Sequence, residues 1–335
     1  MCPTFPPVHN EPIKDLSKKD SYINFKIGAY LALNFNNLLT FLILSLLIFP
    51  LSEAAPLKIH FIDVGQGDSI LLQSGGKNML VDAGPAENGG TLVSYLQALG
   101  ISTVDVIVGT HPHEDHIGGM VDVLNNFNVD LYVDNGVAHT TLTYENLLNK
   151  LVNDQIPYAE VKEGITIPFA PEIVVSVISP TNITGDMNED SIILKITVGS
   201  QKILLTGDSS LSPGDVRAQI LKVPHHGSKF SSDSYYYEQV NPEVAVICVG
   251  TDNEFGHPSP EVIKNIENAG AIIFRTDIDG TIVISTDGNS WDVESLGKEL
   301  NLSNSSYQLS HRRATSPIPK PTQRTYSPID APVIA

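Results

Sequence analysis

The stretch that decides the fold runs from residue 110 to residue 119 and reads Thr-His-Pro-His-Glu-Asp-His-Ile-Gly-Gly. It follows the apolar run VDVIVG, which predicts a buried strand. Three imidazoles and a carboxylate therefore share one loop at a strand end: His111, His113, Asp115 and His116. Zinc and similar metals favour such nitrogen and oxygen ligands. Because a loop can turn side chains to different sides, we expect the first two to face one ion and the last two to face a second.

Two later strand ends carry further ligand types. The run KILLTGD ends in Asp208, and a carboxylate at a strand end can bridge two metals with its two oxygens. The run LKVPHHGSK contains His225 and His226, whose side chains would point apart on an extended chain. One of them can then bind a metal while the other reaches the substrate or orients a ligand. Ser228 and Lys229 offer a hydroxyl group and a positive charge to a negatively charged substrate.

Four more residues belong to the candidate site in supporting roles. Asp63, Asp68 and Asp82 lie in the segments FIDVGQGDS and VDAG, which lack the spacing of metal ligands. We expect their carboxylates to hold the metal-binding loop by hydrogen bonds. His257, in EFGHPSPE, precedes a predicted helix. It either contacts the substrate or the metal-bound water, or it stabilises its loop without a catalytic role.

The folded body is predicted to span residues 56–299. Its runs rich in valine, isoleucine and leucine are bounded by glycine, aspartate, asparagine or proline and are typical of strands. Helical patterns interleave at TLVSYLQAL, GGMVDVLNNF, YENLLNKLVN and SPEVIKNIENAG. Hairpins come first and strand–helix alternation follows. This order indicates an α+β fold in which two packed sheets are flanked by helices.

The two ends of the chain differ from this body. Residues 1–55 combine a lysine-containing polar start, the apolar run LLTFLILSLLIFPL and small residues, which predicts a signal peptide or a membrane anchor. A buried core helix is the alternative for the apolar run. The first prediction places the catalytic domain outside the cytoplasm, secreted or anchored, with the N-terminal segment contacting the membrane or the export machinery. Residues 300–335 are rich in serine and proline and predict a disordered tail.

Charge and cysteine content restrict the functional classes. The formal net charge is −18 and the sequence pI is about 4.8, so the surface repels nucleic acid and anionic membranes at long range. An anionic substrate is still allowed, because bound divalent metals would dominate the local field of a site. The two cysteines, Cys2 and Cys248, cannot form a disulfide framework or a CxxC zinc site. Imidazole and carboxylate groups must therefore hold any metal.

The ordered motifs resemble those of a known superfamily. HPHEDH followed by two glycines, LLTGD and a later strand-end histidine resemble the metallo-β-lactamase superfamily. DVGQGDS, VDAG, LKVPHHGS and FGHPSPEV further resemble the hydrolase domain of ComEC-type competence proteins and, more distantly, phosphorylcholine esterase. The likeness covers residues 57–286. It implies a metallo-β-lactamase-type αββα sandwich, two packed mixed sheets flanked by helices.

The resemblance also implies a ligand for each metal. In the superfamily pattern His111 and His113 would bind the first metal, and Asp208 would bridge the two metals. The second metal would be bound by Asp115, His116 and His226. His225 would lie beside the substrate. The superfamily usually supplies a third histidine to the first metal. Here that place holds Asn188, so water, Asn188 or Asp190 would complete the first site.

We therefore expect a metal-dependent hydrolase with two divalent ions, zinc before manganese. In this hypothesis a metal-bound hydroxide attacks phosphorus or a carbonyl, Asp208 takes up the proton, and the substrate is a small phosphodiester or a nucleic acid. The alternatives are a β-lactam, lactone or phosphocholine-type ester hydrolase, and a non-catalytic metal-stabilised accessory module for DNA uptake. The change at Asn188 favours the last of these. The sequence indicates no protein partner.

Overall fold

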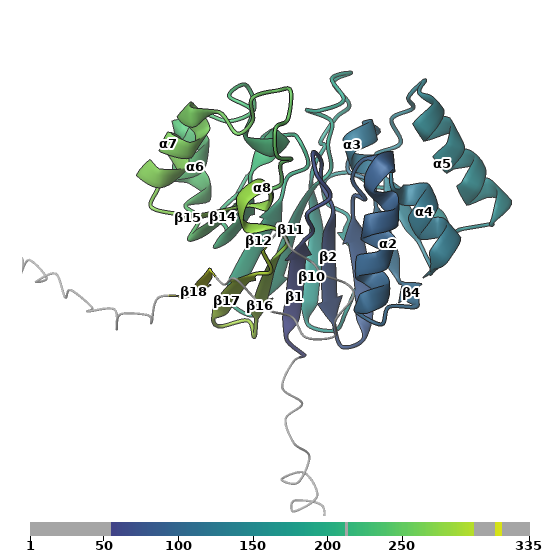
Figure 1. Ribbon diagram of the computed structural model, residues 1–335, viewed down its shortest axis with the longest axis horizontal. Coiled ribbons are helices and arrows are strands. Elements are labelled where there is room, and N and C mark those ends of the chain that lie inside the picture. The colour runs from purple at the N-terminus through teal and green to yellow at the C-terminus, as the bar shows by residue number, and fades with distance from the viewer. Residues whose placement is uncertain (1–54, 212–213, 298–311, 317–335) are drawn as a thin grey trace, which may run out of the picture. The chain divides into compact units, whose positions relative to one another are not determined.

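Two sheets form the centre of the molecule in the computed structural model, which describes residues 55–211, 214–297 and 312–316. Helices lie against the outer face of each sheet (Figure 1). The layers therefore run helix, sheet, sheet, helix, which confirms the expected α+β sandwich.

The first sheet has nine strands in the order β18-β17-β16-β1-β2-β3-β5-β7-β8. The pairs from β18 to β3 are antiparallel, and those from β3 to β8 are parallel. The bounds are β1 Leu57–Phe61, β2 Ile70–Ser74, β3 Lys77–Val81, β5 Val106–Val108, β7 Tyr132–Asp134, β8 Tyr158–Glu160, β16 Ile282–Thr286, β17 Trp291–Ser295 and β18 Arg313–Thr315. A separate pair joins β4 Thr103–Val104 to β6 Asn128–Val129.

The second sheet has seven strands in the order β15-β14-β13-β12-β11-β10-β9. Its strands are antiparallel from β9 to β12 and parallel from β12 to β15. The bounds are β9 Thr166–Ile167, β10 Ile173–Ser179, β11 Ile193–Val198, β12 Gln201–Leu205, β13 Ile220–Lys222, β14 Val244–Ile247 and β15 Ile272–Arg275. Both sheets are therefore mixed, as expected.

Two of the longer helices begin at a capping side chain. Thr141 accepts a hydrogen bond from the backbone of Tyr144 at the start of one helix, and Ser259 caps another that has proline at its first position. The bounds are α2 Gly89–Ala98, α3 Glu114–Ile117, α4 Met120–Asn126, α5 Leu142–Asn153, α6 Ser234–Val240, α7 Pro260–Asn268 and α8 Thr276–Asp279, with short 3₁₀ turns η1 Ala86–Asn88 and η2 Pro224–Gly227.

Three apolar clusters hold the layers together. The central cluster lies between the sheets and combines residues such as Phe61 and Val81 of the first with Val175 and Leu194 of the second. A second cluster packs the outer face of the first sheet against α2, α4 and α5, and a third packs the second sheet against α6 and α7. Residues of β10 alternate between buried and more exposed, as expected for a strand with one covered face.

Several elements were not predicted from the sequence, among them β8, β9, β17, the short helices α3 and α8, helix α6 and strand β18. Helix α6 lies in the tyrosine-rich segment SYYYEQV, where Asp233 caps the first turn and Tyr237 and Val240 are buried. Strand β18 falls within the predicted disordered tail. It is ordered because it pairs with β17 and packs Ala314 against the central cluster.

The predicted leader lies outside the described residues, as does the rest of the tail. Among the described residues, no helix combines the length and the apolar character that a membrane span requires.

Candidate metal centre

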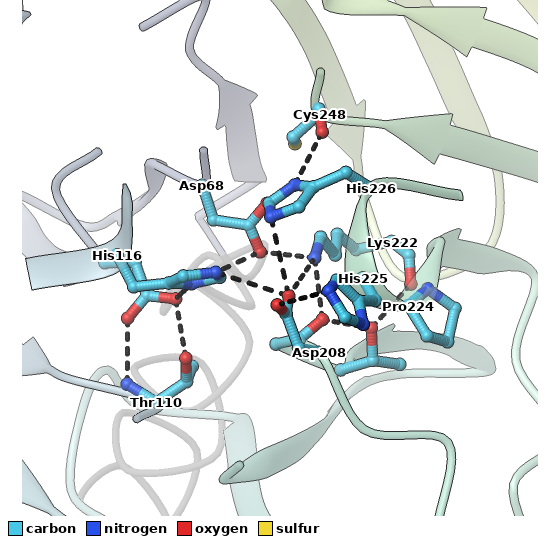
Figure 2. A network of polar contacts seen from close by, with 12 residues as sticks. Asp68, Thr110, His116, Asp208, Lys222, Pro224, His225, His226 and Cys248 are labelled. Carbon is cyan, nitrogen blue, oxygen red and sulfur yellow. Dashed lines mark hydrogen bonds and ion pairs between the residues drawn. The ribbon is translucent and has the colours of Figure 1, made fainter. Parts of the chain in front are cut away.

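The predicted ligands gather because their strands end at the same side of the sandwich. His111, His113, Asp115 and His116 follow β5 of the first sheet, whereas Asp208 and His226 follow β12 and β13 of the second. Short loops then bring the two sets together between the sheets. Figure 2 shows His116 reaching across to Asp208 and His226.

Four of these side chains have the spacing of a tetrahedral metal site. Nε2 of His116 lies 3.2 Å from Oδ1 of Asp208 and 3.9 Å from Oδ2 of Asp115. Nε2 of His226 lies 3.2 Å from the same Asp115 oxygen and 3.6 Å from the same Asp208 oxygen. Ligands about 2.1 Å from a tetrahedral zinc ion are separated by about 3.4 Å. The four atoms could therefore share one ion with little movement.

A second group forms on the other side of Asp208. Nε2 of His111 lies 3.0 Å from Nδ1 of His113 and 3.8 Å from Oδ2 of Asp208. The two oxygens of Asp208 thus face different groups of imidazoles, Oδ1 toward His116 and Oδ2 toward His111. This is the arrangement that a carboxylate bridging two metals requires.

Unpaired buried atoms test whether the residues present fit a metal. Nε2 of His116, Nε2 of His226 and Oδ1 of Asp208 are all buried and have no hydrogen-bond partner among the described residues. Buried polar atoms are rarely left unsatisfied, because their lost hydration costs free energy. All three belong to the tetrahedral group. A divalent cation would satisfy them together, so the donor set fits a metal.

Hydrogen bonds orient the imidazoles of His111, His116 and His226 so that Nε2 faces the centre. Nδ1 of His116 donates to Oδ2 of Asp82 at 2.8 Å, and Nδ1 of His226 donates to the backbone oxygen of Cys248 at 2.8 Å. Nδ1 of His111 lies 3.2 Å from the hydroxyl of Ser191. Such partners on the far nitrogen fix the tautomer and the ring orientation of a metal-binding histidine.

Asp82 also holds the metal-binding loop itself. Its carboxylate accepts hydrogen bonds from the backbone N–H and the hydroxyl of Thr110, immediately before the loop. Its backbone is left-handed (φ 59°), a conformation that aspartate adopts more readily than most residues. The supporting role expected of Asp82 agrees with this position.

The charges of the centre depend on one another. Burial raises the pKa of Asp208, but the imidazoles of His116 and His226 lower it more, so that the carboxyl pKa is well below its usual range. Burial lowers the pKa of His226, but the neighbouring carboxylates of Asp208, Asp115 and Asp68 raise it to about 9. A metal must displace the proton from such an imidazole, so metal affinity should fall in acid.

Lys222, the last residue of β13, was not predicted to belong to the site. Its side chain is fully buried and contacts the carboxylate of Asp68 and, at 2.7 Å, the backbone oxygen of Gly207. The available signal was a lysine inside an apolar strand, three positions before His225. Ser191 was also missed as a partner of His111, and its hydroxyl further accepts a hydrogen bond from the backbone of Asp208.

The histidine pair does not have the extended backbone that was expected. His225 and His226 lie in the turn η2 with φ of 48° and 51°, in the left-handed region. The side chains nevertheless diverge: that of His226 is buried, and that of His225 is 29% exposed with Nε2 3.6 Å from Oδ2 of Asp208. Consecutive non-glycine residues in this conformation are strained, and strain of this kind clusters at functional sites.

The remaining predicted residues lie at different distances from the centre. The ring of His257 lies 5.8 Å from that of His225, so the two side chains are neighbours. Burial lowers the pKa of His257 to about 4. The hydroxyl of Ser228 is turned into its own loop, where it accepts from the backbone of Phe230. The ammonium group of Lys229 lies over the ring of Phe230, 4.9 Å from its centroid.

Two of the predicted carboxylates, those of Asp190 and Asp63, accept hydrogen bonds from the backbone of their own loops. Asp190 accepts hydrogen bonds from the backbones of Thr184 and Gly185, so its oxygens are occupied. Asp63 accepts from the backbone of Gly65. Asn188 differs, because its side-chain oxygen is buried and has no hydrogen-bond partner among the described residues.

An acidic hollow of about 390 Å³ begins beside the centre. The metal-binding candidate Asp115 lies in its wall, together with Gln66, Pro85, Glu87, Glu114, Asp252, Asn253, Glu254 and Phe255. No lysine or arginine is in this lining. A substrate that approaches along this side would therefore meet negative charge.

Comparisons with known proteins agree with the motifs. A family model described as the metallo-beta-lactamase superfamily matches residues 62–251. ComE operon protein 3 of Bacillus subtilis is 28% identical over 254 residues, covering 67% of this chain and 32% of that protein. Competence protein ComA of Neisseria gonorrhoeae is 28% identical over 247 residues, covering 70% and 32%. The chain thus spans about a third of the length of these relatives, and the expected likeness to competence proteins is confirmed.

Among solved structures, a metallo hydrolase from the archaeon Ignicoccus hospitalis, Igni18, has a similar fold. It is 16% identical with a TM-score of 0.48, covering 68% of this chain and 98% of that one.

Proposed function

The chain belongs to the metallo-β-lactamase superfamily of metal-dependent hydrolases, and from that premise we propose that it cleaves phosphodiester bonds at a centre of two divalent ions. The observation that supports this most directly is the position of Asp208, whose two oxygens face separate groups of ligand atoms. Zinc or manganese suits these nitrogen and oxygen donors. When bound, two such ions lower the pKa of a water and polarise the phosphoryl oxygen.

The charge of the centre supports two ions rather than one. It contains four carboxylates and one ammonium group: Asp68, Asp82, Asp115, Asp208 and Lys222. With neutral imidazoles the centre carries three net negative charges. One divalent ion would leave it negative, whereas two would leave one positive charge. An anionic phosphodiester is attracted only in the second case.

The residues around the metal centre have roles that follow from their positions. His225 is partly exposed and directed toward Asp208, so its Nε2 can donate a hydrogen bond to a phosphoryl or leaving-group oxygen. The ring of His257 lies 5.8 Å from that of His225 and can contact the same substrate group. Asp208 is buried and acceptor-only when ionised, so it can hold the attacking water and receive its proton.

A small diester is better supported as the substrate than a long nucleic acid. The acidic hollow beside Asp115 and the net charge of −18 both repel a polyanion. The names of the relatives, which are competence proteins, favour nucleic acid as the second candidate. We place the reaction outside the cytoplasm, because the apolar run near the N-terminus has the composition of a signal peptide or anchor.

The test is hydrolysis of bis(p-nitrophenyl) phosphate by the full chain loaded with zinc or manganese, beside single-stranded DNA and a β-lactam. His116→Ala removes a ligand of the tetrahedral group and should lower kcat/KM for the diester by at least about 100-fold. His60→Gln alters a buried histidine that contacts Tyr95 instead, and is the matched control. Metal binding without hydrolysis of either phosphodiester would contradict the proposal, and hydrolysis of the β-lactam alone would establish the other enzyme class.

A further inference from the structure

The buried lysine calls for an explanation beyond packing. Lys222 has no exposed surface, although lysine is almost never fully buried unless it is paired. Removing an ammonium group from water carries a large desolvation cost, which a single ion pair often fails to recover. An apolar residue would fit a strand whose other two residues are isoleucine and leucine. The charge at this position must therefore serve the neighbouring groups.

The partner of Lys222 contacts three ligands of the tetrahedral group. Oδ1 of Asp68 lies 3.4 Å from Nδ1 of His226, and Oδ2 lies 3.9 Å from Nδ1 of His116. The backbone N–H of Asp68 donates to the backbone oxygen of Asp115 at 3.1 Å. Asp68 is itself fully buried.

Lys222 itself contacts the fourth ligand, Asp208, which follows the neighbouring strand β12 of the second sheet. Its ammonium donates to the backbone oxygen of Gly207 and lies 3.9 Å from Oδ1 of Asp208. The ion pair between Lys222 and Asp68 therefore reaches all four residues of the tetrahedral group. Figure 2 shows the ammonium between Asp68 and Asp208.

We propose that Lys222 and Asp68 form a positioning pair for the second metal, the ion held by Asp115, His116, His226 and Asp208. The fixed ammonium keeps Asp68 under the two imidazoles and holds the Gly207–Asp208 turn in place. This inference rests on the metal centre of the proposed function, but not on the reaction that it catalyses.

Loss of the ammonium has a specific consequence. Asp68 would become a buried carboxylate without a counter-charge. It would then attract Nδ1–H of His226 away from Cys248, and the ring of His226 would turn from the metal position. Loss of such a supporting partner typically lowers metal affinity by about 10–100-fold.

The test measures metal binding to the full chain rather than turnover. Lys222→Met, Asp68→Asn and the double variant are titrated with zinc against a chromophoric chelator, and with cobalt, whose visible absorption reports ligand geometry. We expect each single variant to bind the second ion about 10–100-fold more weakly, with a changed cobalt spectrum. The double variant should lose no more than the worse single variant, because both changes break one pair. Lys195→Met and Asp215→Asn, which remove an exposed ion pair, are the matched controls.

The double variant keeps the inference testable if a single variant does not fold. It replaces the ion pair with neutral groups and leaves no buried charge unpaired, so far-UV circular dichroism should match that of the unaltered chain. Wild-type zinc affinity and an unchanged cobalt spectrum in this variant would overturn the inference, as would losses that add in the double variant. A chain that binds two ions as described but cleaves no diester would refute the proposed function alone.

Discussion

Single carboxylates decide how the imidazoles of the metal centre are presented. Asp82 fixes the orientation of His116 and also accepts two hydrogen bonds from Thr110, at the start of the metal-binding loop. The carboxylate of Asp82 thus orients His116 directly, and it positions the other ligands of the loop through the backbone at Thr110.

Asp82→Asn should lower zinc affinity by about 10–100-fold while the fold is kept. Asparagine tolerates the left-handed backbone of this position, but its amide has one acceptor oxygen and cannot accept all three hydrogen bonds, from Nδ1 of His116 and from the N–H and hydroxyl of Thr110. Chelator competition measures the affinity. Asp105→Asn removes a carboxylate that pairs with Lys77 at the far end of β3, and should leave zinc affinity unchanged. Equal affinity of the two variants would contradict the role of Asp82.

His60, on β1, is predicted to make stability depend on pH. Burial and the nearby Lys58 lower the pKa of this imidazole from 6.5 to about 4. Above pH 6.5 the ring is neutral in both folded and unfolded chains. As the pH falls from 6.5 toward 4, the unfolded chain takes up the proton first, and stability is lost.

The loss at pH 4 should be about 3 kcal/mol relative to pH 7. Urea denaturation of metal-free wild type and His60→Gln at both pH values isolates this contribution, because the metal ligands titrate alike in both chains. Parallel curves would show that His60 is not the group responsible.

At the residue scale the six candidate ligands could be picked out from the sequence because they lie in short motifs at strand ends, and the structure brings them close together. It could not predict Lys222 or the carbonyl of Cys248 as partners. Their roles arise from pairing between sheets, which local spacing does not encode. The left-handed backbone of His225 and His226 was also missed, since an apolar run before a proline indicated extended chain.

At the scale of elements, the loop after β1 fixes the position of the metal-binding loop. Gly67 has φ of 137° and lies so close to Asp115 that an added Cβ would collide with its carbonyl oxygen. The same carbonyl accepts the hydrogen bond from Asp68. The second glycine of the motif GQGDS is therefore required because the loop after β1 passes close to the metal-binding loop at Asp115.

Gly67→Ala should displace Asp115 and lower zinc affinity by about tenfold or more. Gly76→Ala is the matched control, because its φ of 82° imposes similar backbone strain but no atom lies within 4 Å of the new Cβ. Both variants should unfold at lower temperature than wild type, and only the first should lose metal. Equal zinc affinity in the two would show that the close approach has no effect on the site.

Most strands and the four long helices were predictable from apolar periodicity and capping residues. Two of the exceptions have separate physical causes. Helix α6 buries only one side of a tyrosine-rich segment, and β18 is held by backbone pairing with β17, which needs no apolar run.

At the scale of the whole sandwich, the metal centre joins the two sheets. His111, Asp115 and His116 follow the first sheet and Asp208 and His226 the second, so bound ions would link the halves. Metal that binds the folded chain selectively stabilises it in proportion to the logarithm of its excess concentration.

Removal of metal with a chelator should therefore lower the Tm of the full chain. An ion present at 100 times its Kd contributes about 2.7 kcal/mol, which corresponds to roughly 5–10 °C for a domain of this size. Calorimetry with and without chelator measures the shift, and His116→Ala should show a smaller one. A wild-type Tm that does not respond to the chelator would mean that metal does not link the halves.

The short strand β18 has a consequence for how copies of this protein behave toward one another. Without it, β17 would present a free row of backbone donors and acceptors, and such a row recruits a strand from another chain. Residues 312–316 occupy that row from within, and Arg313, paired with Asp292, places charge along the new border. By pairing with β17, residues 312–316 therefore protect this edge of the sheet from pairing with a strand of another copy.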